Sequence, residues 1–454
     1  MASALAPLET NQGPILLKKI VLLSPKGPLY RHRGGIFPLT MRYAPLTLTT
    51  LAAMVPPEID AVVEIQDEGV QDIDPHLYAD LIGITTITGN APRAYEWADH
   101  FRSRGIPVVM GGPHITLMPD EAQGHADAVV VGYAEESWPQ LLRDFVCGEM
   151  QPRYTQRPDL SLAGMPIPRR DLLKKHRYAT LHTFEATRGC IHTCEFCVVP
   201  AAWGIKPYQK PIEEIIADIR QMRSRHILFL DLNLIADLDY AARLFEALTP
   251  LKITWFGLST IMLADNMELL SMAKRSGCTG LLIGFESLSR KNMHMTRKGF
   301  GHPEEYMRAI QRFHENGIAL MGCFVFGLDE DSPDVFMRTA RFTIDAKIEL
   351  PRFAIVTPFP NTALYKRLNA EGRILTYDWS LYDAQHVVFQ PAQMTPEQLY
   401  QGTEAAWKYT YSWRSMWQRI GRGTPQSFIS WATNLGYRFY AYNLARYYTC
   451  DAPV

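Results

Sequence analysis

The stretch TRGCIHTCEFC, residues 187–197, places Cys190, Cys194 and Cys197 within eight positions of a 454-residue chain that has seven cysteines. It follows an apolar run, so the stretch is predicted to be a loop at the carboxyl end of a strand. Thiolates are soft ligands that suit iron–sulfur clusters and zinc. Three of them can hold three irons of a four-iron cluster and leave the fourth iron open, whereas structural zinc sites take four protein ligands.

Two other interpretations of these cysteines stay open. His192 lies inside the motif and could complete a zinc site, although no second Cys/His pair follows at zinc-finger distance. The cysteines could also be core residues without a ligand role. The spacing favours the iron–sulfur cluster, and a zinc interaction module or a simple electron-transfer protein remains a lesser alternative.

The bulk composition narrows the class of protein. A net charge of −1 with 20% charged residues argues against nucleic-acid binding driven by the overall charge of the protein. The first residues, MASALAPLETNQ, have no basic start and no long apolar run, so no secretory signal is predicted. No stretch approaches the ~20 apolar residues of a membrane span. Seven unevenly spread cysteines suit a reducing compartment, and a cytoplasmic location is predicted, with membrane association as a variant.

Residues 1–150 are predicted to form an α/β domain. Short apolar runs alternate with helical segments such as 91–105, which predicts a doubly wound, Rossmann-like parallel sheet. Ligands of such sheets bind beyond the carboxyl ends of the strands. The predicted strands are 18–24, 61–67, 79–86, 106–112 and 126–132.

A proline-rich segment predicts a linker over residues 151–175, and the strand–helix alternation then resumes over 176–390. About six βα units favour a partial (β/α)6 TIM-like barrel. Beyond residue 390 the chain is predicted to be a helical C-terminal extension, 391–454. The predicted barrel strands are 183–189, 226–233, 253–260, 279–287, 319–327 and 351–359.

The Cys-x3-Cys-x2-Cys spacing, with Phe196 before the last cysteine, resembles the signature of the radical S-adenosylmethionine (SAM) enzymes. The resemblance implies a [4Fe–4S] cluster on the three cysteines, with its open iron bound to the amino and carboxylate groups of SAM. An electron from an external reductant such as flavodoxin or ferredoxin would then break the sulfonium bond and give a 5′-deoxyadenosyl radical.

Later segments resemble the same family. The run ILFLDLNLIAD is similar to its second barrel strand and implies that Asp231 and Asn233 lie near SAM. The run LLIGFES resembles the strand motif in which Glu286 and Ser287 approach the cofactor. The run TPFPNTALYKRL resembles a late-barrel segment of the same family, which usually has glycine where this chain has Asn361. Asparagine tolerates the left-handed backbone conformation that glycine would adopt there.

A doubly wound domain ahead of such a barrel resembles the cobalamin-binding subclass. GGPH, residues 111–114, is followed by DAVVVGYAEES, in which Gly132 and Glu135 match the outer positions of the Gly-Glu-Gly-Glu usual there. Glycines at strand ends let a backbone approach a flat macrocycle, although each also suits a tight turn. The implied cobalamin-binding residues are Gly34, Gly35, Gly89, Gly111, Gly112, His114, Gly132 and Glu135.

In methionine-synthase-like cobalamin domains, the histidine of an Asp-x-His-x-x-Gly motif coordinates cobalt. This motif does not occur here, and Tyr30 stands where the aspartate would precede His32. Cobalt is therefore expected to lack a histidine ligand, with His114 hydrogen-bonded near the corrin edge. A doubly wound domain that has lost its cofactor is the alternative.

The last 54 residues hold thirteen aromatic residues, and six Lys/Arg face two acids. Trp413 and Trp417 fall on one helical face, which favours a peripheral membrane contact or a hydrophobic partner. An aromatic helix packed on the barrel would have the same pattern.

The resemblance implies a cobalamin-dependent radical SAM enzyme, with C-methylation of an unactivated carbon in a hydrophobic or natural-product substrate, lipid-like or tetrapyrrole. A non-methylating cyclase, rearrangement or oxidative enzyme is the alternative. Cys278 and Cys323 could donate hydrogen, or could pack in the barrel core.

Overall fold

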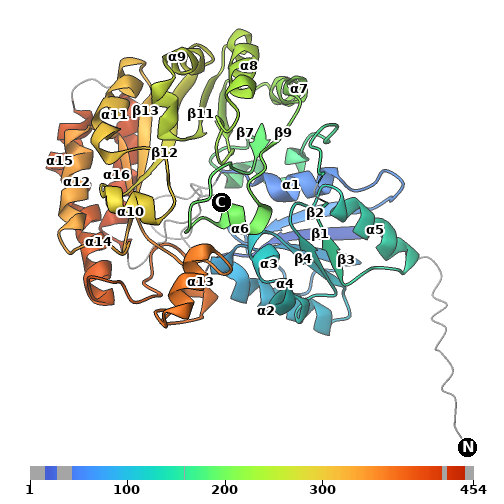
Figure 1. Ribbon diagram of the computed structural model, residues 1–454. Helices are drawn as coiled ribbons and strands as arrows, with labels where there is room; N and C mark the ends of the chain where they lie inside the picture. Colours follow the sequence, from blue (N-terminus) through green and yellow to red (C-terminus); the bar gives the residue numbers. More distant parts are fainter. Residues whose placement is uncertain (1–15, 28–42, 158, 422–426, 445–454) are drawn as a thin grey trace, which may run out of the picture.

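The computed structural model describes residues 16–27, 43–157, 159–421 and 427–444. Two six-stranded parallel sheets form the cores of two neighbouring domains (Figure 1). Both sheets and the C-terminal helices confirm the predicted α/β fold class. Tyr30, His32, Gly34 and Gly35 lie outside the described residues.

The first sheet has the order β2-β1-β3-β4-β5-β6. Its first five strands confirm the prediction. The sixth was not predicted, and it lies inside the segment assigned to the linker. The strands are β1 (Lys19–Ser24), β2 (Val62–Asp67), β3 (Leu81–Thr85), β4 (Val108–Gly111), β5 (Ala128–Val131) and β6 (Arg153–Thr155).

Helices cover both faces of this sheet because alternate strand residues point to opposite sides. Val21 and Leu23 pack in one core cluster with Phe101, while Ile20 and Leu22 pack in the other. This arrangement is the predicted doubly wound fold. The helices are α1 (Leu46–Ala53), α2 (Ala91–Ser103), α3 (Pro113–Leu117), α4 (Pro119–Gln123) and α5 (Ser137–Cys147).

The second sheet has the order β14-β13-β12-β11-β10-β7, with every neighbouring pair parallel. All six predicted barrel strands are confirmed, and the sheet is open between β14 and β7. The strands are β7 (Thr183–Phe184), β10 (His226–Phe229), β11 (Thr254–Ser259), β12 (Cys278–Glu286), β13 (Ala319–Phe326) and β14 (Leu350–Ile355). The helices around them are α7 (Ile212–Met222), α8 (Leu238–Leu248), α9 (Met267–Arg275), α10 (Arg290–Met295), α11 (Tyr306–Glu315), α12 (Val335–Asp345) and α13 (Ala363–Ala370).

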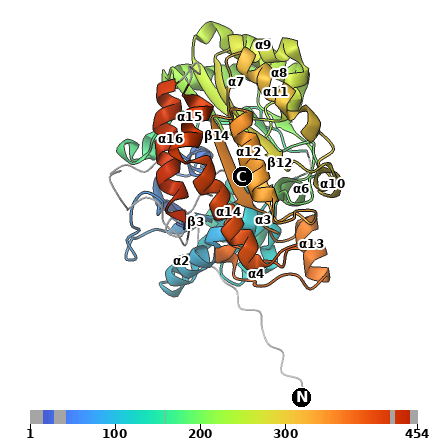
Figure 2. The ribbon, with the colours of Figure 1, turned by 90° about the vertical axis from the view of Figure 1, so that its left-hand side faces the viewer.

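Three C-terminal helices, α14 (Pro396–Thr410), α15 (Trp413–Ile420) and α16 (Ser427–Ala441), lie against β14 and α12 (Figure 2). Trp407 is buried and donates its indole N–H to the carbonyl oxygen of Phe353 over 3.0 Å. Tyr411 donates its hydroxyl to the carbonyl oxygen of Pro351 over 2.7 Å. These two aromatic residues fasten the extension to the edge strand of the barrel.

A segment late in the barrel returns to the first domain. Trp379 donates its indole N–H to Glu121 Oε1 over 3.0 Å. Trp379, Tyr382 and Val388 belong to the same core cluster as Phe101 of the first domain. Among the described residues, none of the helices combines the length and the apolar composition that a membrane span requires.

Candidate functional site

The carboxyl ends of the two sheets face one another. The loop after β5 meets the segment after β8 (Thr187–Arg188), where the rings of Tyr133 and Trp203 stack in parallel with centroids 5.2 Å apart. The amide group of Asn361, after β14, donates to the carbonyl oxygen of Leu117 in α3. Ligands of parallel sheets bind at such ends, so this junction is the candidate site.

The cysteine loop begins at β8 and ends at α6 (Val198–Trp203). Gly189 opens it with φ +81°, and a Cβ atom there would lie 2.7 Å from the carbonyl oxygen of Lys206, so only glycine fits without strain. Asp231 accepts hydrogen bonds from the Ala186 amide (3.0 Å) and the Thr187 hydroxyl (2.8 Å). Asp231 therefore holds the strand that leads into the loop.

The three thiols gather on this loop. Burial raises the pKa of Cys194 to about 11 and that of Cys197 to about 12, and the sulfur atoms are close enough for their charges to influence one another. Iron must displace protons from such thiols, which couples cluster binding to pH. No group of three or more His, Cys, Asp or Glu in the described part of the chain has the geometry of a single-ion site. A cubane cluster does not need that geometry, because each thiolate binds a different iron.

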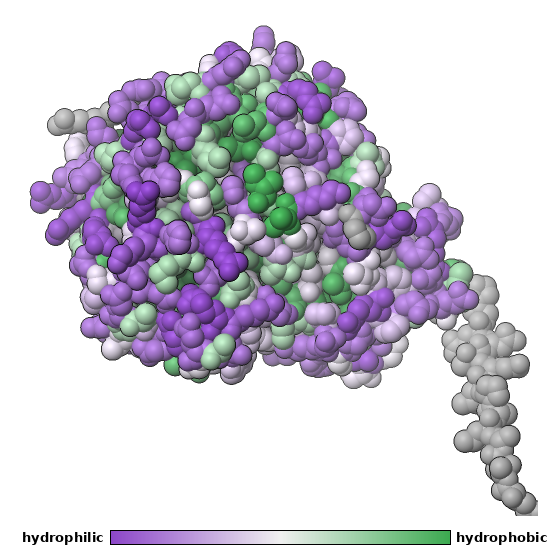
Figure 3. Space-filling model, in the orientation of Figure 1, coloured by the Kyte–Doolittle hydropathy of each residue, from purple (hydrophilic) through white to green (hydrophobic). Residues whose placement is uncertain are grey.

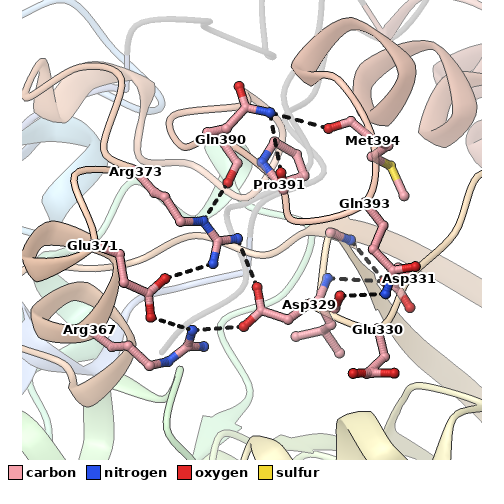
Figure 4. Close-up of polar contacts among 12 residues, drawn as sticks. Asp329, Glu330, Asp331, Arg367, Glu371, Arg373, Gln390, Pro391, Gln393 and Met394 are labelled. Atoms are coloured by element: carbon pink, nitrogen blue, oxygen red, sulfur yellow. Dashed lines mark hydrogen bonds and ion pairs between the residues drawn. The ribbon is translucent and has the colours of Figure 1, made fainter.

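Glu195, between the second and third cysteines, anchors the loop to the rest of the barrel. Its amide donates to the Thr296 carbonyl oxygen (2.9 Å), and its own carbonyl accepts from the Leu364 amide (3.0 Å). Its carboxylate lies 2.7 Å from Arg367 of α13. Figure 4 shows that Asp329 lies between Arg367 and Arg373, with ion-pair distances of 2.7 and 2.8 Å. A pocket lies beside this network and is lined in part by Glu195 and Arg367.

Glu286 and Lys298 form a charge pair next to the cysteine loop. Lys298 Nζ lies 2.8 Å from Glu286 Oε1 and donates to the Gly284 carbonyl oxygen over 2.7 Å. The ammonium group is buried, and its charge opposes the burial effect on the pKa of Cys194. Glu286 has φ +59°, and a Cβ atom on Gly284 would lie 2.2 Å from its carboxylate. The backbone at the end of β12 is thus shaped around this pair.

Ser287 and Asn233 are buried at the same edge of the sheet. The Ser287 hydroxyl accepts from the Asn292 amide group (3.3 Å), which also donates to Asp331 (2.8 Å). Asn233 Oδ1 accepts from the Ile235 amide over 3.3 Å. Both predicted SAM residues therefore lie at strand ends facing the junction, within networks that fix their side chains.

The predicted residues of the first domain lie at its carboxyl edge. His114 is fully buried, with its ring nitrogens 3.3 Å from the Thr88 hydroxyl and 3.5 Å from the Glu121 carboxylate, so both face protein partners. Gly112 has φ +104°, and a Cβ atom there would meet the backbone of Thr86 at 2.7 Å. Gly89 and Gly111 lie at the same edge, Gly89 in the turn before α2 and Gly111 at the end of β4.

Glu135 pairs with Arg188 at the contact between the domains. Arg188 is also 2.8 Å from Glu185 and lies over the ring of Tyr133. Burial opposes the charge of Arg188, but Glu185 and Glu135 outweigh it and hold the arginine pKa above its ordinary value. Gly132 has φ +87° and its amide donates to the Thr116 hydroxyl over 3.0 Å.

Four buried polar atoms at this junction have no hydrogen-bond partner within the described residues: Thr86 Oγ1, Glu135 Oε2, His192 Nε2 and Thr260 Oγ1. Each of the four residues follows the carboxyl end of a strand: β3, β5, β8 and β11, respectively. Buried polar groups without partners are costly, so such groups are satisfied by water or a ligand. The residues present therefore fit polar ligands bound between the two sheets, as the cluster with SAM and cobalamin require.

The sequence patterns missed Lys298, Arg188 and Thr86. No motif singles out Lys298, which is brought to Glu286 by the fold of α10 and the turn after it. Arg188 could have been noticed as a basic residue directly before the cysteine loop. Thr86 follows a predicted strand end, where ligand-binding residues gather.

Comparison with known proteins agrees with the two domains. Residues 184–343 match the Radical SAM superfamily and residues 44–142 match the B12 binding domain. The chain is 29% identical over 415 residues to bacteriochlorophyllide d C-12(1)-methyltransferase of Chlorobaculum tepidum, covering 87% of this chain and 88% of that protein. It is 24% identical to the hopanoid C-2 methylase of Rhodopseudomonas palustris, covering 74% and 66%.

Among solved structures, the radical SAM methyltransferase TsrM of Kitasatospora setae, with cobalamin and a [4Fe–4S] cluster bound, has a TM-score of 0.65 at 16% identity and covers 78% of each chain. This likeness shows a shared fold. The two domain matches and the methyltransferase relatives mean that the chain is an enzyme of the cobalamin-dependent radical SAM methyltransferase family.

Proposed function

We propose that this enzyme methylates an unactivated carbon of a hydrophobic substrate, a tetrapyrrole or a lipid-like molecule. The observation that carries the proposal is the junction itself, where three thiols and four unpaired buried polar atoms of the described residues lie between the carboxyl ends of two parallel sheets. The relatives named for bacteriochlorophyllide d and for hopanoids support the substrate class, because both molecules are largely apolar.

In this proposal Cys190, Cys194 and Cys197 hold the cluster. Glu286 and Lys298 present opposite charges beside it, and the amino-acid end of SAM likewise carries an ammonium and a carboxylate. The pair therefore matches SAM in charge and orients it at the cluster. Ser287 and Asn233 border the same position, while Asp231 acts through the strand that it holds.

The first domain would hold cobalamin at its carboxyl edge. That edge lacks Cβ atoms at four positions, so a ligand can approach its backbone closely: Gly89, Gly111, Gly112 and Gly132. The Thr86 hydroxyl, unpaired within the described residues, can form a hydrogen bond with a polar group of the ligand there. Gly34 and Gly35 belong to the same proposal. His114 supports the edge from inside the domain. When bound, the cluster with SAM supplies the radical that takes a hydrogen atom, and cobalamin supplies the methyl group.

Two partners complete the proposal. The cluster needs a one-electron reductant, for which flavodoxin or ferredoxin is suited. An apolar substrate favours a peripheral membrane contact through the C-terminal helices.

The test is anaerobic reconstitution with iron, sulfide and hydroxocobalamin, then reduction with SAM that carries a deuterated methyl group. Bacteriochlorophyllide d and a hopanoid are offered separately. The expected result is substrate that gains one labelled methyl group, with 5′-deoxyadenosine and S-adenosylhomocysteine formed in equal amounts.

Single variants of the three loop cysteines to alanine are expected to abolish deoxyadenosine formation. Cys147→Ala is the matched control, because Cys147 is an exposed cysteine at the end of α5 and remote from the loop. Deoxyadenosine without S-adenosylhomocysteine would replace methyl transfer with a non-methylating radical reaction. Normal turnover by a loop-cysteine variant would overturn the assignment of the cluster.

A further inference from the structure

The C-terminal helices carry an exposed aromatic surface. Trp413 and Trp417 of α15 are 58% and 62% exposed, which is unusual for side chains of this size. Leu435, Phe439 and Tyr442, in and directly after α16, are 43–46% exposed. We call these five residues the aromatic surface. Helices α15 and α16 lie on the side that Figure 2 turns toward the viewer, whereas the face in Figure 3 is mostly hydrophilic, with apolar residues along its middle.

Ring and cation–π contacts join the two helices that carry the aromatic surface. Arg438 lies over the rings of both Trp413 and Tyr442, at 4.8 and 4.4 Å, and so joins α15 to the end of α16. Trp417 is 6.1 Å from Trp431, one turn before Leu435. Contiguous exposed apolar patches of this kind mark interaction sites.

The helices below the patch are held firmly, so the surface is a built feature. Arg419 is buried and donates to the carbonyl oxygens of Ile348 (3.0 Å), Glu349 (2.8 Å) and Thr410 (3.0 Å). It also donates to Asn434 Oδ1 of α16 over 3.0 Å. One guanidinium therefore joins α14, α15, α16 and the segment that leads into β14.

The charge of this region has one sign. Residues 405–450 contain six Lys/Arg and no Asp or Glu. Tryptophan and tyrosine, with a polar edge on an apolar ring, suit the boundary between lipid headgroups and acyl chains. Basic residues beside them attract anionic headgroups.

We infer that the aromatic surface docks on an anionic lipid bilayer, with Trp413 and Trp417 inserted between headgroups. The inference gives the membrane contact of the proposed function a specific surface and lipid class, and it rests on that function only for the apolar nature of the substrate. Arg446, Tyr447 and Tyr448 extend the same composition in the sequence as far as residue 450.

The test is co-sedimentation of the full-length protein with vesicles of phosphatidylcholine alone or of phosphatidylcholine with phosphatidylglycerol. Binding to the anionic vesicles is expected, and it should weaken with added salt. The double variant Trp413→Ser/Trp417→Ser should bind about tenfold more weakly, because interfacial affinity scales with buried apolar area. Tyr78→Ser, which changes a 64% exposed aromatic residue on the first domain, is the matched control.

Light scattering and deoxyadenosine formation are measured on the same variants. The double variant should stay folded and should still form deoxyadenosine from SAM, so a failed membrane contact is distinguishable from a failed catalytic assignment. Absence of vesicle binding, or binding unchanged in the double variant, would overturn the inference. A wild-type dimer that the double variant breaks would assign the surface to a second copy of the chain instead.

Discussion

Arg367→Met tests how the cysteine loop is held. Arg367 is 33% exposed and bridges Glu195, which is only 8% exposed, to Asp329. Without the guanidinium, Asp329 keeps Arg373, but Glu195 becomes a buried carboxylate without an ion-pair partner within the described residues. Removing one member of a buried pair costs about 3–5 kcal/mol, and the partial exposure of Arg367 reduces the expected cost to roughly 2–3 kcal/mol.

This cost should appear as local opening of the loop. The amides of Glu195 and Leu364, whose hydrogen bonds fix the loop to α10 and α13, report it directly by hydrogen exchange. A loss of roughly 2–3 kcal/mol predicts exchange roughly 30- to 150-fold faster at these amides. Iron retained after reconstitution should fall in parallel, because a mobile loop holds its thiols less well.

The control for Arg367→Met is Arg290→Met. Arg290 pairs with Glu304 over 3.1 Å but is 73% exposed, so its removal should change exchange by less than about threefold. In the double variant Glu195→Gln/Arg367→Met, the combined effect should be smaller than the sum of the two single effects, because a neutral glutamine side chain in place of Glu195 leaves no charge to compensate. Unchanged exchange in Arg367→Met, or strict additivity, would refute an anchoring role for this ion pair.

Three further predictions concern the charge pair, the first domain and pH. Lys298→Met should abolish SAM cleavage while iron binding is kept, and Lys298→Arg should restore part of the cleavage. The control is Lys291→Met, because the Lys291 side chain is 80% exposed. Full activity of Lys298→Met would contradict the proposed role of Lys298 in orienting SAM. Gly112→Ala should lower the free energy of unfolding by more than about 2 kcal/mol and reduce cobalamin retention, because the new Cβ atom would meet the Thr86 backbone at 2.7 Å. The control Gly105→Ala has no atom within 4 Å of the new Cβ atom and should lower it by about 1 kcal/mol. Equal melting temperatures of the two variants would contradict this prediction. The hydrogen bond that His386 donates to the Asp383 carboxylate raises the pKa of His386, so the protonated ring stabilises the fold below its usual pKa of about 6.5 and this stability is lost as pH rises through the folded pKa. His386→Gln should therefore lower the melting temperature more at about pH 6 than at about pH 8, and the opposite order would refute the sign.

The strands could be predicted from sequence because they are nearly continuous apolar runs. The central strands of the first sheet are buried on both faces, whereas those of the second sheet alternate buried with half-buried residues. Strand β6 was not predicted, for the converse reason. It has three residues, of which only Tyr154 is buried, and it lies in a proline-rich segment. The return of residues 376–389 to the first domain could not be predicted either, since Trp379 and Tyr382 look like any aromatic pair until their partners are known.

The sequence predicted the edge of the sheet at which the candidate residues lie, but not the groups that their side chains face. Strand endings placed Asp231 and Glu286 at the correct edge of the sheet, yet the sequence cannot say that Asp231 faces the backbone of residues 186 and 187. Burial and neighbouring Glu185 even raise the pKa of Asp231 to about 7, against the effect of its hydrogen bonds. Lys298 was missed because its role depends on a contact across a loop, which no spacing rule encodes.

The contact between the domains links the two halves of the proposed chemistry. Arg188 directly precedes the loop that carries the thiols, and its side chain pairs with Glu135 of the first domain. Tyr133, close to Glu135 in the chain, stacks on Trp203, the last residue of the helix α6 that follows the cysteine loop. The residue before the loop and the helix after it thus both contact one short segment of the first domain. A shift of that segment should move the thiols as well, so these contacts between described residues help to set the geometry between the two proposed cofactor sites.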